Sequence, residues 1–426
     1  MPEIDKTTDE ICRDMIKKNK KASLLILLCW LVYTCSYIGK LGYNANITQI
    51  EAFYGVSHAQ TGMATTFFFF AYGLGQIING AFCKKYNIRF VVFGSLLISG
   101  LMNLFIAFVD TFETLKYLWM INGAALSILW TSLIRLLSEN LDEKYMARAV
   151  VIMGTTVASG TFLVYGFSAL FVALSAFRMI FYFAAILLPI VAIVWMIGYF
   201  FLIPKQRCDN ALSIVCAEKN ASKSRGNCIN SVGGIIAILA FYAVIDNLVK
   251  DGLTTWVPTI LKELYRIPDY VGILLTLLLP VFSIFGTMVA VALYKKIKSF
   301  VGICLLLFFC SAIFILITIL CLPINAFAIT LGSFSFVSCL MAGVNNVITS
   351  MMPLYYKEKL NSGMIAGILN GFCYLGSTIS SYGLGCIADV WGWSTVFWTI
   401  LALTLMACCV GGVYMINKKR DNNDRV

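Results

Sequence analysis

Two lysines stand inside stretches that are otherwise almost entirely apolar. Lys40 lies in LVYTCSYIGKLGYNANI and Lys250 in FYAVIDNLVKDGLTTWVP, and each begins a Lys-x-Gly pattern. A cation inside hydrocarbon costs about 2.5–3.5 kcal/mol on insertion scales, so such a residue indicates a functional site by default. Two facing ammonium groups predict a site for a dianion, because one bound anion compensates both charges.

The same two charges predict how the site operates. An empty site would carry two unpaired cations through any closed intermediate, away from water. That penalty disfavours return of the unloaded protein and favours the exchange of one anion for another. The sequence therefore predicts an anion antiporter.

Each lysine also has a structural alternative. Lys40 could extend its ammonium group to the outer membrane surface. Asp246 stands four residues before Lys250, on the same helical face, and Asp251 is adjacent, so Lys250 could belong to a purely structural ion pair. If Asp246 neutralises Lys250, a zwitterionic or neutral polar solute becomes an alternative substrate.

Composition decides what kind of element holds these lysines. Of the 426 residues, 60% are hydrophobic and 12% are charged, whereas soluble domains are about 45–50% apolar and about 25% charged. So much apolar surface predicts an all-α membrane protein with lipid as its solvent. The single histidine excludes His-rich metal sites and His-centred triads, and the fifteen cysteines contain no C-x-x-C pair, so we expect no metal, no cofactor and no enzyme.

Apolar segments long enough for a bilayer, about 20 residues each, divide the chain into two sets of six. A polar linker over residues 204–230 separates a bundle at 23–203 from a bundle at 231–416, with tails at 1–22 and 417–426. The twelve predicted transmembrane helices are 23–50, 59–82, 90–109, 116–138, 147–174, 178–203, 231–260, 269–293, 299–320, 325–350, 362–386 and 393–416. Lys40 follows Ser23 by seventeen residues and Lys250 follows Gly233 by seventeen, which predicts matching depths on the first helix of each pseudo-symmetric half.

The distribution of lysine and arginine predicts the orientation. With both termini in the cytoplasm, 25 of the 32 Lys and Arg residues fall in cytoplasmic segments and 4 in outer segments. Such an asymmetry is typical of the positive-inside rule. The excess of positive charge therefore indicates orientation in the cell (inner) membrane, and no nucleic-acid partner is expected.

Several motifs resemble one family. The segment AGILNGFCYLGSTISSYGLGCIADVWGW (366–393) is similar to the eleventh-helix signature of the organophosphate:phosphate antiporters, a branch of the major facilitator superfamily. NGAALSILWTSLIRLLS (122–138), VKDGLTTWVPTIL (249–261) and YIGK (37–40) resemble the fourth, seventh and first helices of that branch. The resemblance implies two six-helix bundles around a central cavity. It also implies exchange of a sugar phosphate or glycerol phosphate for phosphate by alternating access.

The resemblance places the phosphate-clamping role on Lys40 and Lys250, where the family usually has arginine. A lysine binds phosphate as a point charge and lacks the bidentate fork of arginine. Gln76 stands where glycerol-phosphate carriers have a lysine, Thr155 where they have a histidine, and Lys84 where the superfamily has a loop acid. The full predicted substrate-binding set is Lys40, Lys250, Tyr37, Tyr72, Gln76, Thr155, Asp246, Asn370 and Tyr374.

Three functions therefore remain open for this chain, which we expect to act as a monomer on a small anionic substrate. The first is exchange of an organic phosphate ester for phosphate. The second is transport of another organic anion, such as a sugar acid or carboxylate, with proton coupling through Asp246. The third is a carrier-like membrane sensor that binds a sugar phosphate and signals to a partner. We also expect Gly154, Gly160, Gly166, Gly367, Gly371 and Gly376 to allow close helix contacts.

Overall fold

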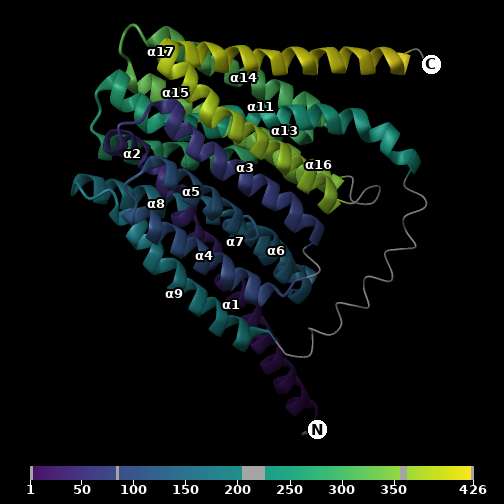
Figure 1. The fold of residues 1–426 in the computed structure, drawn as a ribbon. Helices are drawn as coiled ribbons and strands as arrows, with labels where there is room; N and C mark the ends of the chain where they lie inside the picture. The colour runs from purple at the N-terminus through teal and green to yellow at the C-terminus, as the bar shows by residue number, and fades with distance from the viewer. Residues whose placement is uncertain (1–2, 83–85, 204–225, 356–361, 424–426) are drawn as a thin grey trace.

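The computed structural model describes residues 3–82, 86–203, 226–355 and 362–423, and these residues form helices and no β-strand (Figure 1). Most of the predicted linker, residues 204–225, and Lys84 lie outside the described residues. The first half of the chain comprises α1 (Glu3–Ala45), α2 (Ile47–Tyr54), α3 (His58–Phe82), α4 (Ile88–Phe108), α5 (Phe112–Leu126), α6 (Leu129–Asn140), α7 (Glu143–Gly154), α8 (Thr156–Ala173) and α9 (Met179–Leu202). The second half comprises α11 (Gly226–Tyr265), α12 (Asp269–Thr276), α13 (Leu278–Ile297), α14 (Phe300–Cys321), α15 (Phe327–Asn346), the π-helix η4 (Val347–Met351), α16 (Met352–Tyr355) and α17 (Ser362–Asn423).

Nine helical segments within the described residues are long and apolar enough to cross a membrane. One of the nine, Gly367–Asn417 in α17, is 51 residues long and contains two predicted spans. The chain changes direction there at Gly392, whose φ of 76° lies in a region that glycine adopts without strain. The predicted spans 59–82 and 231–260 correspond to α3 and part of α11, which carry more polar residues. Twelve transmembrane helices therefore account for the fold.

Several predicted spans consist of two shorter helices. The segment 116–138 divides into α5 and α6, 147–174 into α7 and α8, and 269–293 into α12 and α13. The first span ends at Ala45, before its predicted limit, and α2 follows as a separate helix. At this break the side-chain amide of Asn46 donates to the Gly42 carbonyl and to Ser168 Oγ. The bond to the Gly42 carbonyl competes with regular helix bonding.

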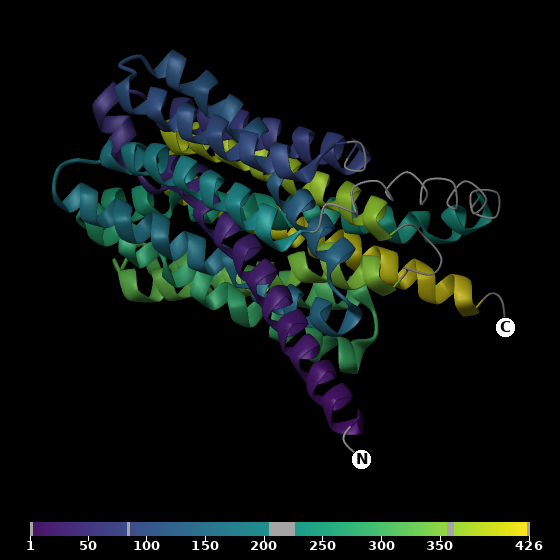
Figure 2. The same ribbon diagram turned by 90° about the horizontal axis from the view of Figure 1, so that it is seen from below.

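The long helix α17 joins the two halves of the chain by packing against both α3 and α11 (Figure 1). A side chain at Gly62 of α3 would collide with the carbonyl of Ser381, and one at Gly376 of α17 would collide with the carbonyl of Val244 in α11. Glycine thus permits the backbones to approach closely at both interfaces. Figure 2 shows that the two ends of the described chain lie at the same end of the bundle, opposite the α2–α3 turn.

Candidate substrate-binding site

Lys40 is surrounded by tyrosine rings from three helices. Its Nζ lies 4.2 Å from the ring centroid of Tyr72 in α3, 5.4 Å from that of Tyr37 in α1 and 5.6 Å from that of Tyr374 in α17. The rings of Tyr72 and Tyr374 contact one another, with centroids 4.8 Å apart. Ring faces attract a cation. Among the described residues no carboxylate forms an ion pair with this ammonium group.

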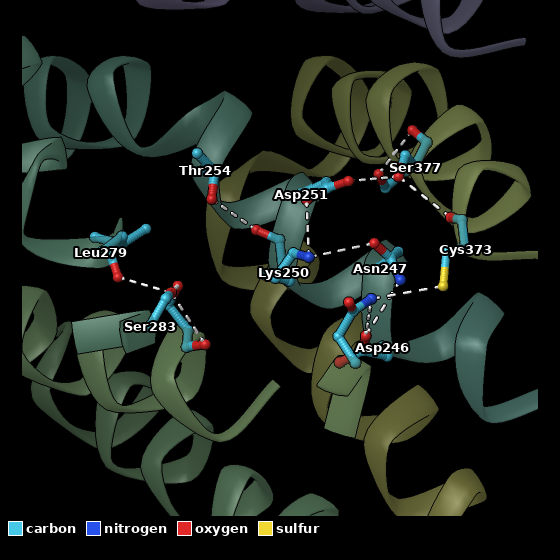
Figure 3. A network of polar contacts seen from close by, with 12 residues as sticks. Asp246, Asn247, Lys250, Asp251, Thr254, Leu279, Ser283, Cys373 and Ser377 are labelled. Carbon is cyan, nitrogen blue, oxygen red and sulfur yellow. Dashed lines mark hydrogen bonds and ion pairs between the residues drawn. The ribbon is translucent and has the colours of Figure 1, made fainter. Parts of the chain in front are cut away.

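Lys250 has a different environment, which Figure 3 shows. Its Nζ lies 3.7 Å from Asp251 Oδ1, and it donates to Asn247 Oδ1 at 3.4 Å. The other carboxylate oxygen of Asp251 accepts a hydrogen bond of 2.5 Å from Ser377 Oγ of α17. The structure does not form the Asp246–Lys250 ion pair that spacing offered as an alternative, because Lys250 turns toward Asp251.

The two lysines lie at a similar level on neighbouring helices. The amide of Asn44 in α1 donates to Thr255 Oγ1 in α11 at 3.2 Å. Lys40 precedes Asn44 by four residues and Lys250 precedes Thr255 by five, so both lie about one helical turn from this contact, on the same side of it. Tyr37 is within electrostatic range of both ammonium groups. The matched depth predicted from sequence is therefore present in the structure.

Neither lysine is sealed within the protein. Both residues are partly exposed, and the side chain of Lys250 keeps 24% of its accessible surface. An ammonium group can donate three hydrogen bonds, and the 3.4 Å contact to Asn247 is at the long limit for one. Both groups can thus still donate to an incoming anion.

Asp246 lies one turn from Lys250 in a fully buried pocket. Its Oδ2 accepts bonds of 3.2 Å from the amides of Asn247 and of Asn345 in α15, whereas its Oδ1 is buried without a partner. Asn345 also donates to Cys373 Sγ at 3.5 Å. A buried carboxylate oxygen without a donor is costly. Asp246 is therefore a candidate for proton binding.

The structure places the other predicted residues in two different settings. Gln76 and Asn370 meet between the halves, since the amide of Asn370 donates to Gln76 Oε1 at 3.1 Å. Thr155 is exposed, accepts a bond of 2.9 Å from the Trp30 indole and donates to the carbonyl of Ile152. These hydrogen bonds do not join it to either lysine.

A groove of about 530 Å³ lies along α1 and α8 and is separate from the lysines. Its walls are almost wholly apolar, and its lining residues are Trp30, Thr34, Ser159, Phe162, Leu163, Gly166, Phe167 and Leu170. Such a surface offers nothing to hold an anion.

A second polar cluster, which sequence reasoning missed, surrounds the only histidine. His58 Nδ1 lies 2.9 Å from Glu51 Oε1 in α2, and its Nε2 lies 3.1 Å from Glu263 Oε1 in α11. Trp393 Nε1 donates to Glu263 Oε2 at 2.7 Å, and Asp389 accepts from the backbone N–H groups of His58 and Ala59 at 3.1 and 2.8 Å. We call these residues the His58 cluster.

Comparisons with known proteins agree with this architecture. A family model described as Major Facilitator Superfamily matches residues 29–362. A probable hexose phosphate transport protein of Chlamydia muridarum is 21% identical over 409 residues, which cover 88% of this chain and 87% of that protein. The membrane sensor protein UhpC of Escherichia coli (strain K12) is 25% identical over 99 residues, so the match spans 23% of each protein.

Solved structures resemble the fold at low sequence identity. The crystal structure of a D-xylose-proton symporter has a TM-score of 0.73 and 13% identity, and the match covers 91% of this chain and 96% of that chain. A bacterial homologue of the human lysosomal transporter Spinster, in an inward-facing and occupied conformation, has a TM-score of 0.74 and 12% identity, with 92% and 96% covered. At this identity the likeness concerns the fold alone.

Proposed function

The chain belongs to the Major Facilitator Superfamily and is a multi-pass membrane transporter, not an enzyme; from this premise we propose that it is a secondary carrier for an organic phosphate ester. The carrier exchanges a sugar phosphate or glycerol phosphate for inorganic phosphate by alternating access. The chlamydial relative named for hexose phosphate transport supports the substrate class.

One observation carries the proposal. Lys40 and Lys250 come from the first helix of each half and lie about a turn from the same α1–α11 hydrogen bond. Both lysines are partly exposed and their ammonium groups can still donate hydrogen bonds, and among the described residues no acidic partner is held tightly against either. A phosphoryl group has several acceptor oxygens and up to two negative charges, so it can accept from both lysines at once.

The proposed orientation has both termini in the cytoplasm of a cell with an inner membrane. The two ends of the described chain share one end of the bundle (Figure 2), as twelve spans require. The 25 to 4 distribution of Lys and Arg favours the cytoplasm for this end. We assign residues 23–203 and 231–416 to the two bundles, and a single chain contains all the proposed site residues, so a monomer suffices.

The test is exchange in proteoliposomes loaded with labelled phosphate and challenged with a panel of phosphate esters and carboxylates. We expect sugar phosphate or glycerol phosphate to release the label. Lys40→Ala and Lys250→Ala should each lower the exchange rate by at least about 100-fold, because each leaves the anion without one of its two counter-charges inside the membrane. Lys296→Ala, which removes an exposed lysine at the end of α13, is the matched control.

Asp246 supports a second candidate function. Its buried, unpartnered Oδ1 would suit a proton that travels with another organic anion, such as a sugar acid. Under that function, carboxylates and not phosphate esters would drive flux, an inward proton gradient would accelerate it, and Asp246→Asn would remove the acceleration. A sensor of sugar phosphate, the third candidate, would bind the ester and show no flux.

A further inference from the structure

The two lysines of the site are compensated by different means. Lys40 faces three tyrosine rings, and Lys250 faces the carboxylate of Asp251. Strict exchange is expected only where both cations are unpaired in the empty site. The structure removes that condition for Lys250, and the tyrosine rings reduce the penalty for Lys40.

The carboxylate of Asp251 is held in place independently of Lys250. The contact between them can therefore break without a large movement of Asp251. Adjacent residues on a helix point in different directions, so this contact requires that the carboxylate be held from elsewhere. Ser377 of α17 holds it, because its hydroxyl donates to Oδ2 and leaves Oδ1 toward the lysine. Ser377 itself is fully buried.

The length of the Asp251–Lys250 contact indicates a weak, displaceable pair. A charge-assisted N–H···O bond is about 2.7–2.9 Å long, whereas Nζ and Oδ1 are 3.7 Å apart. Both side chains keep 24% of their accessible surface. A substrate oxygen can therefore replace Oδ1 on Lys250 while Ser377 retains the carboxylate (Figure 3).

We propose that Asp251 is the resident counter-ion of Lys250: it compensates the ammonium charge in the empty carrier and gives way to the substrate anion. The inference rests on the proposed function and refines it. An empty site with Lys250 compensated can cross the closed intermediate, so the carrier also performs net transport, although exchange remains the faster mode. Asp251 thereby determines how strictly inward and outward movements are coupled.

The experiment measures two rates in the same proteoliposomes, with the membrane potential held at zero by potassium and valinomycin. Exchange is uptake of labelled glucose 6-phosphate into vesicles loaded with inorganic phosphate, and net transport is its uptake into vesicles without phosphate. Asp251→Asn keeps an acceptor for Ser377 but removes the charge. We expect it to retain exchange and to lower the ratio of net transport to exchange by about tenfold or more, because Lys250 is then unpaired in the closed intermediate.

Three further variants make the result specific to the charge. Asp251→Glu restores a carboxylate and should recover most of the ratio. Ser377→Ala keeps the charge but releases Asp251, so the ratio should fall less than in Asp251→Asn. Asp269→Asn is the matched control, because it removes a carboxylate that pairs with Lys262 at 3.1 Å, also in the second half of the chain.

The outcomes separate this inference from the proposed function. An unchanged ratio in Asp251→Asn overturns the inference and leaves exchange of phosphate esters intact. Loss of both rates in a monodisperse, folded Asp251→Asn protein also overturns it, because a resident counter-ion is not needed for exchange. No flux of glucose 6-phosphate or phosphate in the unmodified carrier overturns the proposed function and the inference together.

Discussion

The lysine site and the His58 cluster both join the two halves of the chain, but their polar groups are satisfied to very different degrees. Around the lysines, an ion pair is 3.7 Å long, a second ammonium faces aromatic rings, and a carboxylate oxygen of Asp246 is unpartnered. Around His58, both ring nitrogens lie within 3.1 Å of carboxylates. Glu263 also accepts a bond from Trp393, and Asp389 accepts bonds from the backbone at the start of α3; these bonds are 2.7–3.1 Å long.

This difference separates a site that receives a ligand from a contact that holds a conformation. Under the proposed function, an anion that binds to both lysines would satisfy these groups, so the lysine site would gain from a substrate. The His58 cluster already has its partners, drawn from α2, α3, α11 and α17, and it closes the end of the bundle opposite the termini. Under the proposed alternating access this cluster would have to open, and its bonds favour the closed form of that end.

Loss of the Glu263 carboxylate should have the largest effect on the closed end of the bundle. Glu263→Gln removes the charge that joins His58 to Trp393 across the halves. Hydrogen bonds to charged groups contribute about 1.5–3 kcal/mol, so opening of this end should become about 10- to 100-fold more frequent. Hydrogen exchange of the backbone amides at residues 51–66 should report it as a comparable loss of protection.

Glu113→Gln is the control for that measurement. Glu113 is an exposed carboxylate that pairs with Lys116 at 2.7 Å within the first half of the chain, so its loss should change protection little. If both variants lose protection equally, the His58 cluster has no special role in closing this end.

The pH dependence of the cluster is a second, smaller effect. His58 precedes the predicted span 59–82. Burial disfavours its charged form, but hydrogen bonds and attraction from Glu263 and Glu51 outweigh burial and raise the pKa of His58 from 6.5 to about 10. The resulting stability is fully present below pH 6.5 and is lost as pH rises toward 10, because the unfolded chain releases its proton first.

Thermal unfolding of detergent-solubilised protein can measure this contribution. The difference in Tm between the unmodified protein and His58→Gln should be greatest near pH 6 and should shrink steadily toward pH 9. A difference that stays constant over this range would mean that the ring contributes by packing against Trp256 and Trp393 and not by its charge.

Hydropathy and glycine patterns predicted much of the fold because lipid restricts the available architectures. The twelve spans and the matched depth of the two lysines follow from counting apolar residues. The breaks within spans did not follow, because they depend on single contacts such as Asn46 with Ser168. Of the glycines predicted to allow close contacts, Gly160, Gly371 and Gly376 do so, whereas Gly154, Gly166 and Gly367 face open space.

The candidate site was predictable only where a charge stood inside an apolar run. That rule identified Lys40 and Lys250, and Tyr72 and Tyr374 were predicted because they fall on helices expected to line the path. It could not choose between Asp246 and Asp251 as the partner of Lys250, because the choice depends on Ser377, which is 126 residues away in sequence. The His58 cluster could not be predicted from the sequence for the same reason, since its acidic residues come from three separate helices.

The smallest expected effect tests whether the rings around Lys40 contribute to binding. Tyr72→Phe keeps the nearest ring, 4.2 Å from Nζ, and should leave the KM for the exchanged anion nearly unchanged. Tyr72→Leu removes the ring and should alter KM by about two- to fivefold, which corresponds to a cation–π contribution of about 0.5–1 kcal/mol. The direction is informative, because a ring that stabilises the empty site competes with the anion, and its loss then lowers KM. A rise in KM would instead show that the ring supports the bound state.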